Sequence, residues 1–381
     1  MLRQDLNVNW EELLADKNTE EKVSAFMDRL QIAMNNHIPK KKISKKKYNK
    51  EPLSVEARRV IRKKHRAWEK YSNKRDNDSY REYTKARNKA KSTVIRERKN
   101  REKDIAESAK TNCKNFWSYI NSKRKSKSGI SELHDKRDGK TFIASNDTDK
   151  AEILAEFFTS VFTKEDDEDE TFLKDIKYDE PSSDEVFKPK EINKLLKNLN
   201  TSKSPGPDQV HPKVLYELAD IIDIPLCIIF SSSFSSGIVP EGWKIGQITA
   251  LFKKGDKKLA SNYRPVNLTS IICKIMEKLI RKRIVDHMNK YGLFGDRQFG
   301  FIGGRSTGLQ LLKVLDHWTE ILDNGGSIDA IYTDFMKAFD KVPHKRLINK
   351  LKSYGISNQT FQGTDVKQKT SHSKHHFNDD I

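Results

Sequence analysis

Apolar residues recur at helical spacing in several long segments of the chain and alternate with polar residues in a few short ones. The first of these patterns predicts a helix from Glu11 to Met34. Between Ser54 and Ile120 the chain contains neither proline nor glycine, and its apolar positions predict one or two long helices. A short hairpin with its turn at Asp138 and Gly139 is expected next, followed by further helices.

Beyond the hairpin, a helix is expected at 151–162, with Thr148 or Asp149 as its N-cap. Pro189 suits the first turn of the helix after it. The remaining expected elements are helices at 190–200, at 214–234 in two parts separated near Pro225, at 270–288, at 307–322 and at 344–355, and strands at 245–253 and 328–334. This order predicts an α+β or α/β fold in which helices pack on a small sheet, and we favour α+β.

The charge is distributed unevenly along the chain. The 381 residues carry a formal net charge of +19, and residues 1–130 hold 36 Lys and Arg against 17 Asp and Glu, while the remainder is balanced. This asymmetry indicates a basic helical arm for a polyanion, with a solvated helical hairpin or a coiled-coil interaction module as alternatives. Trp68, Tyr71, Tyr80 and Tyr83 could stack on nucleic-acid bases or pack on one another.

Several classes of protein are not expected. We find no run of about 18 apolar residues, so we do not expect a membrane protein. The first residues lack the basic segment followed by an apolar one that is typical of a secretory signal, so we expect a nuclear or cytoplasmic chain. The three cysteines are far apart, which argues against a disulfide framework or a zinc site.

The strongest candidate for chemistry is Asp334, which stands at the end of the expected strand 328–334. A strand that delivers a carboxylate in this way can hold a divalent metal ion against a phosphate. Asp340 is too far along the chain to share a close metal pair unless the chain folds back, so it is expected to cap a helix or pair with Lys341 or Lys345. A second ligand must come from elsewhere.

Four segments, read in order, resemble the successive blocks of the reverse transcriptase of non-LTR retrotransposons, LINE-like elements of the jockey or RTE kind: 203–215, 251–280, 296–312 and 332–351. The resemblance implies a right-hand polymerase of which the chain holds the fingers and part of the palm after its long basic helices. It also implies RNA-directed DNA synthesis by Mg²⁺-dependent nucleotidyl transfer. Its partners would be an RNA template, a DNA primer and deoxynucleoside triphosphates.

The resemblance assigns roles at the expected metal site. Asp334 matches the first catalytic aspartate, which holds two Mg²⁺ ions, and the backbone carbonyl of Phe335 would add a ligand. Phe339 matches the aromatic residue that crowds the sugar 2′ position, although core packing is the alternative for this residue alone.

It also assigns roles in nucleotide and template binding. Lys253, Lys254 and Arg264, expected in the loop between two strands, would grip the triphosphate, with a surface salt bridge as the alternative for Arg264. Gln298, Gly300 and Arg305 match a segment that touches the template backbone and the nascent pair, with a glycine-rich connector as the alternative. The turn 204–208 is expected to pack on the fingers.

After residue 356 the sequence becomes polar and aperiodic, and the further blocks of such a polymerase, including the second aspartate motif, are not recognised. Residues 377–380 fit that motif literally but lack apolar strands on both sides. We therefore expect an inactive chain, or, as an alternative function, a non-enzymatic nucleic-acid-binding remnant that uses the basic helices and the fingers loop. The expected division is 1–50, 51–130, 131–200, 201–356 and a disordered tail 357–381.

Overall fold

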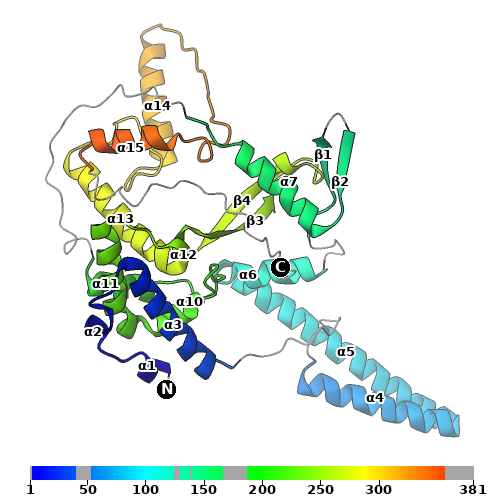
Figure 1. Ribbon diagram of the computed structural model, residues 1–381. Coiled ribbons are helices and arrows are strands. Elements are labelled where there is room, and N and C mark those ends of the chain that lie inside the picture. The colour runs from blue at the N-terminus through cyan, green and yellow to red at the C-terminus, as the bar shows by residue number, and fades with distance from the viewer. Residues whose placement is uncertain (1, 40–52, 124–128, 138–139, 166–186, 357–381) are drawn as a thin grey trace. The chain divides into compact units, whose positions relative to one another are not determined.

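The computed structural model describes residues 2–39, 53–123, 129–137, 140–165 and 187–356. Within these ranges the chain is mostly helical, with two small antiparallel sheets (Figure 1). It divides into two compact units, one formed by residues 40–129 and a larger one by residues 1–39 and 130–381. The expected turn at Asp138 and Gly139 and the tail 357–381 lie outside the described residues.

The smaller unit is a helical hairpin followed by a short helix. Its elements are α4 (Val55–Lys74), α5 (Asn77–Glu107), the 3-10 turn η1 (Ser108–Lys110) and α6 (Cys113–Lys123). Ser54 and Asp76 cap the two long helices, because their side chains accept hydrogen bonds from the backbone N–H groups of Ala57 and Ser79. The predicted long helices are confirmed as α4 and α5, but the prediction missed the break after Glu107, beyond which the stretch to Ile120 contains η1 and most of α6.

The aromatic residues of this hairpin contact one another where α4 passes into α5. The ring centroids of Trp68 and Tyr83 are 4.9 Å apart, and those of Tyr71 and Tyr80 are 5.1 Å apart. These contacts link the two helices across their connection. Of the two alternatives for these residues, the described contacts are those of packing.

The larger unit contains twelve further helical elements among the described residues. They are α1 (Leu2–Asp5), α2 (Trp10–Leu14), α3 (Thr19–His37), α7 (Asp147–Ser160), α9 (Pro189–Lys197), α10 (Pro212–Glu217), α11 (Ala219–Ser236), α12 (Glu241–Lys244), η2 (Ala260–Asn262), α13 (Ile271–Lys290), α14 (Thr307–Asp323) and α15 (His344–Ser353). Its strands are β1 (Leu133–Arg137), β2 (Lys140–Ala144), β3 (Gly246–Phe252) and β4 (Tyr263–Thr269), which pair as β1 with β2 and β3 with β4. The sheets are therefore two separate hairpins.

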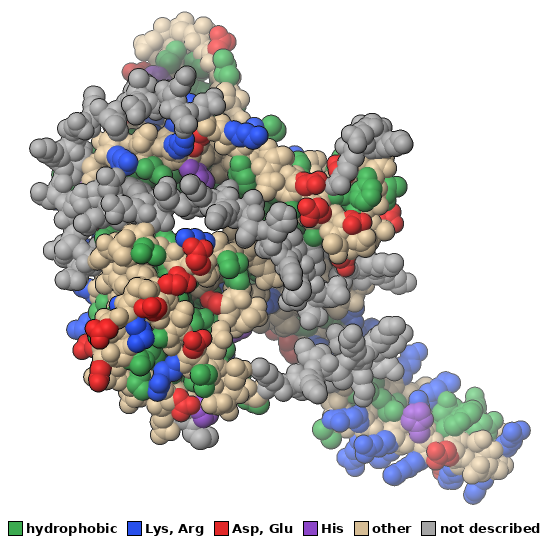
Figure 2. Space-filling model, viewed as in Figure 1, with side chains coloured by type: hydrophobic (Ala, Val, Ile, Leu, Met, Phe, Trp, Pro, Cys, Tyr) green, Lys and Arg blue, Asp and Glu red, His purple; other side chains and the backbone are tan. Residues whose placement is uncertain are grey.

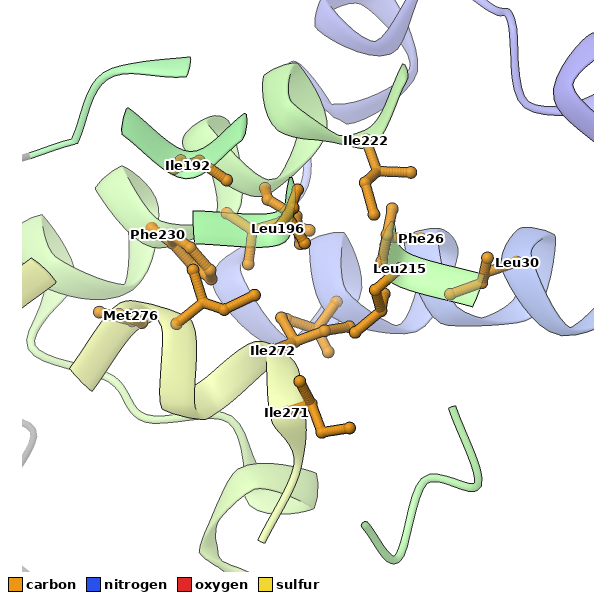
Figure 3. Close-up of a cluster of buried hydrophobic side chains, with 14 of the residues drawn as sticks. Phe26, Leu30, Ile192, Leu196, Leu215, Ile222, Phe230, Ile271, Ile272 and Met276 are labelled. Atoms are coloured by element: carbon orange, nitrogen blue, oxygen red, sulfur yellow. The ribbon is translucent and has the colours of Figure 1, made fainter. Parts of the chain in front are cut away.

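The main core of this unit lies among α3, α9, α11 and α13 (Figure 3). Its largest fully buried side chains include Phe26 of α3, Leu196 of α9, and Ile222 and Phe230 of α11. By length and composition alone α11 could cross a membrane, although its two aspartates and five serines mean that it is not the continuous apolar run that the sequence lacks. Eight of its residues are nevertheless buried, and it packs on α2, α3 and α9 as a core helix. Helices α1 to α3 thus contribute to this core, although the sequence places residues 1–50 in a segment of their own.

Three details of the expected helices are wrong. The helix expected from Glu11 is split into α2 and α3, because Asn18 forms a capping box with Glu21 and begins a new helix. The N-cap of α7 is Asn146, whose side chain accepts from the backbone N–H of Asp149. Pro225 lies buried inside α11 rather than between two helices, and the break falls at Leu218, since burial of the apolar helix outweighs the missing backbone hydrogen bond.

The expected strands differ in outcome. The strand at 245–253 is confirmed as β3. The strand at 328–334 is wrong, because in the described part of the chain no strand lies beside this segment to complete its hydrogen bonds. Ile331 and Tyr332 remain 90% and 87% exposed. The predicted helices at 270–288, 307–322 and 344–355 are confirmed as α13, α14 and α15.

Candidate functional site

The β3–β4 hairpin presents the cations that the resemblance places at a nucleotide. In the register of the two strands Leu251 lies opposite Arg264, so Arg264 belongs to β4 and not to the loop in which it was expected. Lys253, Lys254 and Arg264 are all exposed. The backbone N–H of Lys253 donates to the carbonyl of Asn262 at 2.9 Å and closes the loop at the end of the strands.

Two further cations of this loop were not singled out by the sequence. Lys257 and Lys258 are exposed, and the Lys257 ammonium lies 5.4 Å from the centroid of the Phe252 ring. The sequence could have indicated them, because Lys257 and Lys258 directly follow Gly255 and Asp256, as Lys253 and Lys254 directly precede those two residues. The loop therefore carries four lysines around one turn.

A second small core fixes the position of this loop. The Tyr263 hydroxyl donates to the carbonyl of Lys257 at 2.8 Å, and the backbone N–H of His134 in β1 donates to the carbonyl of Lys258 at 2.8 Å. Tyr263 is buried with residues of β1, β2, α7 and η2, namely Leu133, Ala144, Ile153, Leu154, Phe158 and Ala260. Because its backbone is anchored to a hydrophobic cluster, the loop holds its lysine side chains toward solvent on a defined turn.

The segment 295–306 forms a loop closed by an arginine. The guanidinium of Arg305 donates to the carbonyls of Gly295 and Gln298 at 2.8 and 2.6 Å, and it lies 5.9 Å from the centroid of the Phe299 ring. The Gln298 amide donates to the carbonyl of Gly300 at 3.3 Å. Gln298, Gly300 and Arg305 are thus brought together in one loop.

This loop leads directly into a helix. The Ser306 hydroxyl accepts from the backbone N–H of Leu309 at 3.2 Å and caps α14. An added Cβ at Gly300 would have no heavy atom within 4 Å. Gly300 therefore leaves the backbone open to an approaching ligand.

Asp334 lies in an exposed segment together with exposed apolar side chains. Asp334 is exposed, and Phe335 and Phe339 are 85% and 80% exposed. The ring of Phe339 stands at 89° to that of Phe301, with 6.2 Å between the centroids. The structure therefore brings Phe339 next to the loop of Arg305, but it gives Phe339 little of the core packing that was the alternative for it.

The turn after Asp334 is held by a lysine. Lys337 adopts a positive φ of 57°, and its ammonium lies 3.9 Å from the centroid of the Phe157 ring of α7. Burial against this ring lowers the pKa of the Lys337 ammonium, although Asp340 opposes the shift. This contact ties the Asp334 segment to the helix that supports the β3–β4 loop.

The metal expected from the resemblance does not find a ligand set here. Among the residues that the structure describes, no three side chains of His, Cys, Asp or Glu gather as a metal site would require. Mg²⁺ is usually bound through one or two carboxylates together with substrate phosphates, so Asp334 would need a bound nucleotide, a second carboxylate or both. The described residues therefore provide no group of three protein ligands for the metal ion.

Comparison with known proteins identifies relatives of the second half of the chain. Residues 252–377 match the family model described as reverse transcriptase (RNA-dependent DNA polymerase). The chain is 33% identical over 163 residues to a probable RNA-directed DNA polymerase from transposon BS of Drosophila melanogaster, an alignment that covers 42% of this chain and 18% of the relative. It is 31% identical over 173 residues to the RNA-directed DNA polymerase from mobile element jockey of Drosophila funebris, covering 45% and 19%.

A vertebrate relative is more distant. An uncharacterized 149 kDa protein of transposon TX1 from Xenopus laevis is 28% identical over 171 residues, which cover 44% of this chain and 13% of the relative. The matched part thus spans less than a fifth of the length of each of these curated relatives.

Proposed function

Part of this chain is a reverse transcriptase domain of the kind found in non-LTR retrotransposons, and from this premise we propose that its polymerase blocks serve RNA-directed DNA synthesis. The family works on a nucleic-acid template and primer with deoxynucleoside triphosphates and a divalent metal ion. In this proposal residues 201–356 are the fingers and part of the palm. The observation that carries it is the anchored β3–β4 loop, whose cations surround one exposed turn.

The triphosphate would bind at this turn. Lys253, Lys254 and Arg264 are exposed at the end of the hairpin, and a nucleoside triphosphate is a compact polyanion that Lys and Arg bind through charge-assisted hydrogen bonds. Lys257 and Lys258 extend the same positive region. Arg264 is the geometrically restrained member, because its backbone is paired to Leu251 in the sheet.

The template would lie at the loop 295–306, and the reacting end of the primer would lie at the segment around Asp334. Gln298, Gly300 and Arg305 would line the template backbone, where Arg305 holds the loop in shape through two carbonyls. Asp334 and the carbonyl of Phe335 would face the metal ions that the family uses, which supply the charge that stabilises phosphoryl transfer. Phe339 would limit the space at the sugar, and its contact with Phe301 supports its placement beside that loop.

Replacing Arg264 by alanine is expected to weaken the binding of a fluorescent dTTP analogue to the full chain by about ten-fold or more. A hydrogen bond between charged groups contributes about 1.5–3 kcal/mol, and each 1.4 kcal/mol is about ten-fold in affinity. Fluorescence titration measures the effect. Lys190→Ala, at an exposed lysine of α9, is the matched control and should leave the affinity unchanged. Equal weakening in both variants, or none in Arg264→Ala, would contradict the proposed triphosphate site.

We further propose that this polypeptide does not extend a primer by itself, because no group of three or more His, Cys, Asp or Glu side chains that could hold a metal ion forms among its described residues. Incubation of the full chain with poly(rA), oligo(dT), dTTP and Mg²⁺ should leave the primer at its original length on a sequencing gel. Extension that disappears in Asp334→Ala would show that the chain is active and would support the role of Asp334. Extension that survives in that variant would come from a contaminating polymerase.

A further inference from the structure

The hairpin of α4 and α5 carries two rows of cations that the polymerase function does not use. The α4 row comprises Arg59, Arg62, Lys63, Arg66 and Lys70. The α5 row comprises Arg81, Lys85, Lys89, Arg96, Lys99 and Lys103. Spacings of three, four and seven residues place the members of each row on one side of their helix. All of these side chains are exposed, and Figure 2 shows many Lys and Arg side chains on the surface of the hairpin.

The two rows lie on the same side of the hairpin. Lys70 of the α4 row binds Glu82 of α5 at 2.7 Å, and Arg96 of the α5 row binds Glu56 of α4 at 3.3 Å. Glu82 stands three residues before Lys85, and Glu56 stands three residues before Arg59. Each ion pair therefore joins one row to a carboxylate beside the other row, and both rows border the same groove between α4 and α5. We call the two rows together the basic face.

Most of the cations of the basic face are not neutralised within the hairpin. In the described ranges, Lys85, Lys89 and Lys99 have no ion-pair partner, and the same holds for Arg59, Arg62, Lys63 and Arg66. The pairs that do form are exposed, with 46% exposure at Lys70 and 62% at Arg96. Exposed pairs contribute little and exchange readily, so their cations remain accessible to a stronger polyanion.

The dimensions and the aromatic contacts indicate which polyanion fits. From Arg81 to Lys103 the α5 row is about 33 Å long at about 1.5 Å per residue, close to the roughly 34 Å of one turn of a nucleic-acid duplex. Proteins that bind single strands stack bases on aromatic rings. Here the rings of Trp68, Tyr71, Tyr80 and Tyr83 face one another at the connection of the helices instead of lying in the rows.

We propose that the basic face binds the sugar-phosphate backbone of a double-stranded nucleic acid, without reading its sequence. A straight, rigid row of cations matches the regular and dense phosphates of a duplex, which carries about one charge per 1.7 Å of its axis. RNA and DNA duplexes share this chemistry. The inference does not depend on the proposed polymerase function, because it uses none of the residues assigned to nucleotide, metal or template.

The test is the affinity of the full chain for fluorescent 20-base-pair RNA and DNA duplexes of unrelated sequence, measured by anisotropy over a series of salt concentrations. The triple variant Lys85→Gln, Lys89→Gln and Lys99→Gln removes three cations of the α5 row. We expect it to weaken duplex binding by roughly ten-fold and to make the slope of log affinity against log salt shallower by about 2.7, which is about 0.9 for each phosphate that the variant no longer neutralises. Glutamine is nearly as good a helix former as lysine, so the hairpin should remain folded.

The matched control removes the same charge from the larger unit. The variant Lys190→Gln, Lys194→Gln and Lys213→Gln changes three exposed lysines of α9 and α10, and its affinity and salt slope should stay within about two-fold of the unchanged chain. Circular dichroism confirms that each variant is folded.

The outcomes separate the alternatives. Weaker duplex binding in the variant of Lys85, Lys89 and Lys99 alone supports the proposal. The relative affinities for the two duplexes show whether RNA or DNA is preferred. Equal weakening in both triple variants would mean that only net charge matters, and the proposal would be wrong. Tighter binding to a single strand of the same length, or displacement of the duplex by anionic lipid vesicles at equal phosphate concentration, would overturn the assignment to a duplex. The dTTP titration of the proposed function is a separate measurement, so failure of the nucleotide site would be seen independently of duplex binding.

Discussion

Replacing Ile222 by alanine is expected to lower the free energy of unfolding of the larger unit by about 2–5 kcal/mol. Ile222 lies in α11 with its side chain fully buried, and it faces Leu215 and Phe26 in the main core (Figure 3). Alanine would remove buried apolar surface and leave a cavity that the surrounding helices fill only in part. Urea unfolding followed by circular dichroism measures the decrease.

The same helix offers a matched control two residues further on. Ile224 is 46% exposed, so Ile224→Ala makes the same chemical change while removing little buried surface. It should change the free energy of unfolding by less than about 0.5 kcal/mol. If both variants were destabilised equally, α11 would not present Ile222 to the core as described.

Replacing Gly206 by alanine is expected to cost about 1–3 kcal/mol of stability, because the added methyl group has no room. A Cβ atom at this position would lie 2.6 Å from the carbonyl oxygen of Thr269 and 3.0 Å from the Cα atom of Ser270. Both are backbone atoms at the junction of β4 and α13, so they cannot rotate away as a side chain would. Thermal and urea unfolding of the full chain measure the cost.

Gly242 provides the control for this substitution. A Cβ atom there would have no heavy atom within 4 Å, and the residue lies in α12, where alanine is the better helix former. Gly242→Ala should therefore leave the stability unchanged or raise it by up to about 1 kcal/mol. A Gly206→Ala variant as stable as Gly242→Ala would show that the turn 204–208 does not pack against the end of β4.

The position of Gly206 also bears on the polymerase blocks. The sequence predicts that the turn 204–208 packs on the fingers, and the structure places Gly206 against the last residue of β4, the strand that carries Arg264. Destabilising this contact should therefore disturb the hairpin whose loop carries the proposed triphosphate cations. Reduced stability in Gly206→Ala would be accompanied by weaker dTTP binding, whereas Ile224→Ala should leave both unchanged.

The helices could be predicted well because their signals are local. In α9 the spacing of Ile192 and Leu196 identifies the buried face, and in the basic hairpin the absence of proline and glycine allows long helices. The exact starts were harder, since Asn18 and Asn146 compete with other capping residues nearby. Pro225 was misplaced because its local cost is outweighed by the burial of a whole apolar helix, which depends on helices distant in the sequence.

For the site, the candidate residues could be named from the sequence alone. The order of the blocks, the lysines on both sides of Gly255 and the carboxylate of Asp334 are written in the chain and required no contacts to be recognised. The excess of charge in the first third of the chain was likewise visible from composition alone.

The way in which these residues are presented depends on contacts between distant parts of the chain. The tertiary structure placed Arg264 in a strand, used Arg305 to close a loop, set Phe339 against Phe301, and gave the segment before Asp334 no partner strand among the described residues. It also brought the cations of α4 and α5 to one side of the hairpin, where two ion pairs join the helices. The physical reason is the same in each case: a helix forms from interactions within about four residues, whereas strand pairing, loop closure and a shared face require groups far apart in the chain to meet.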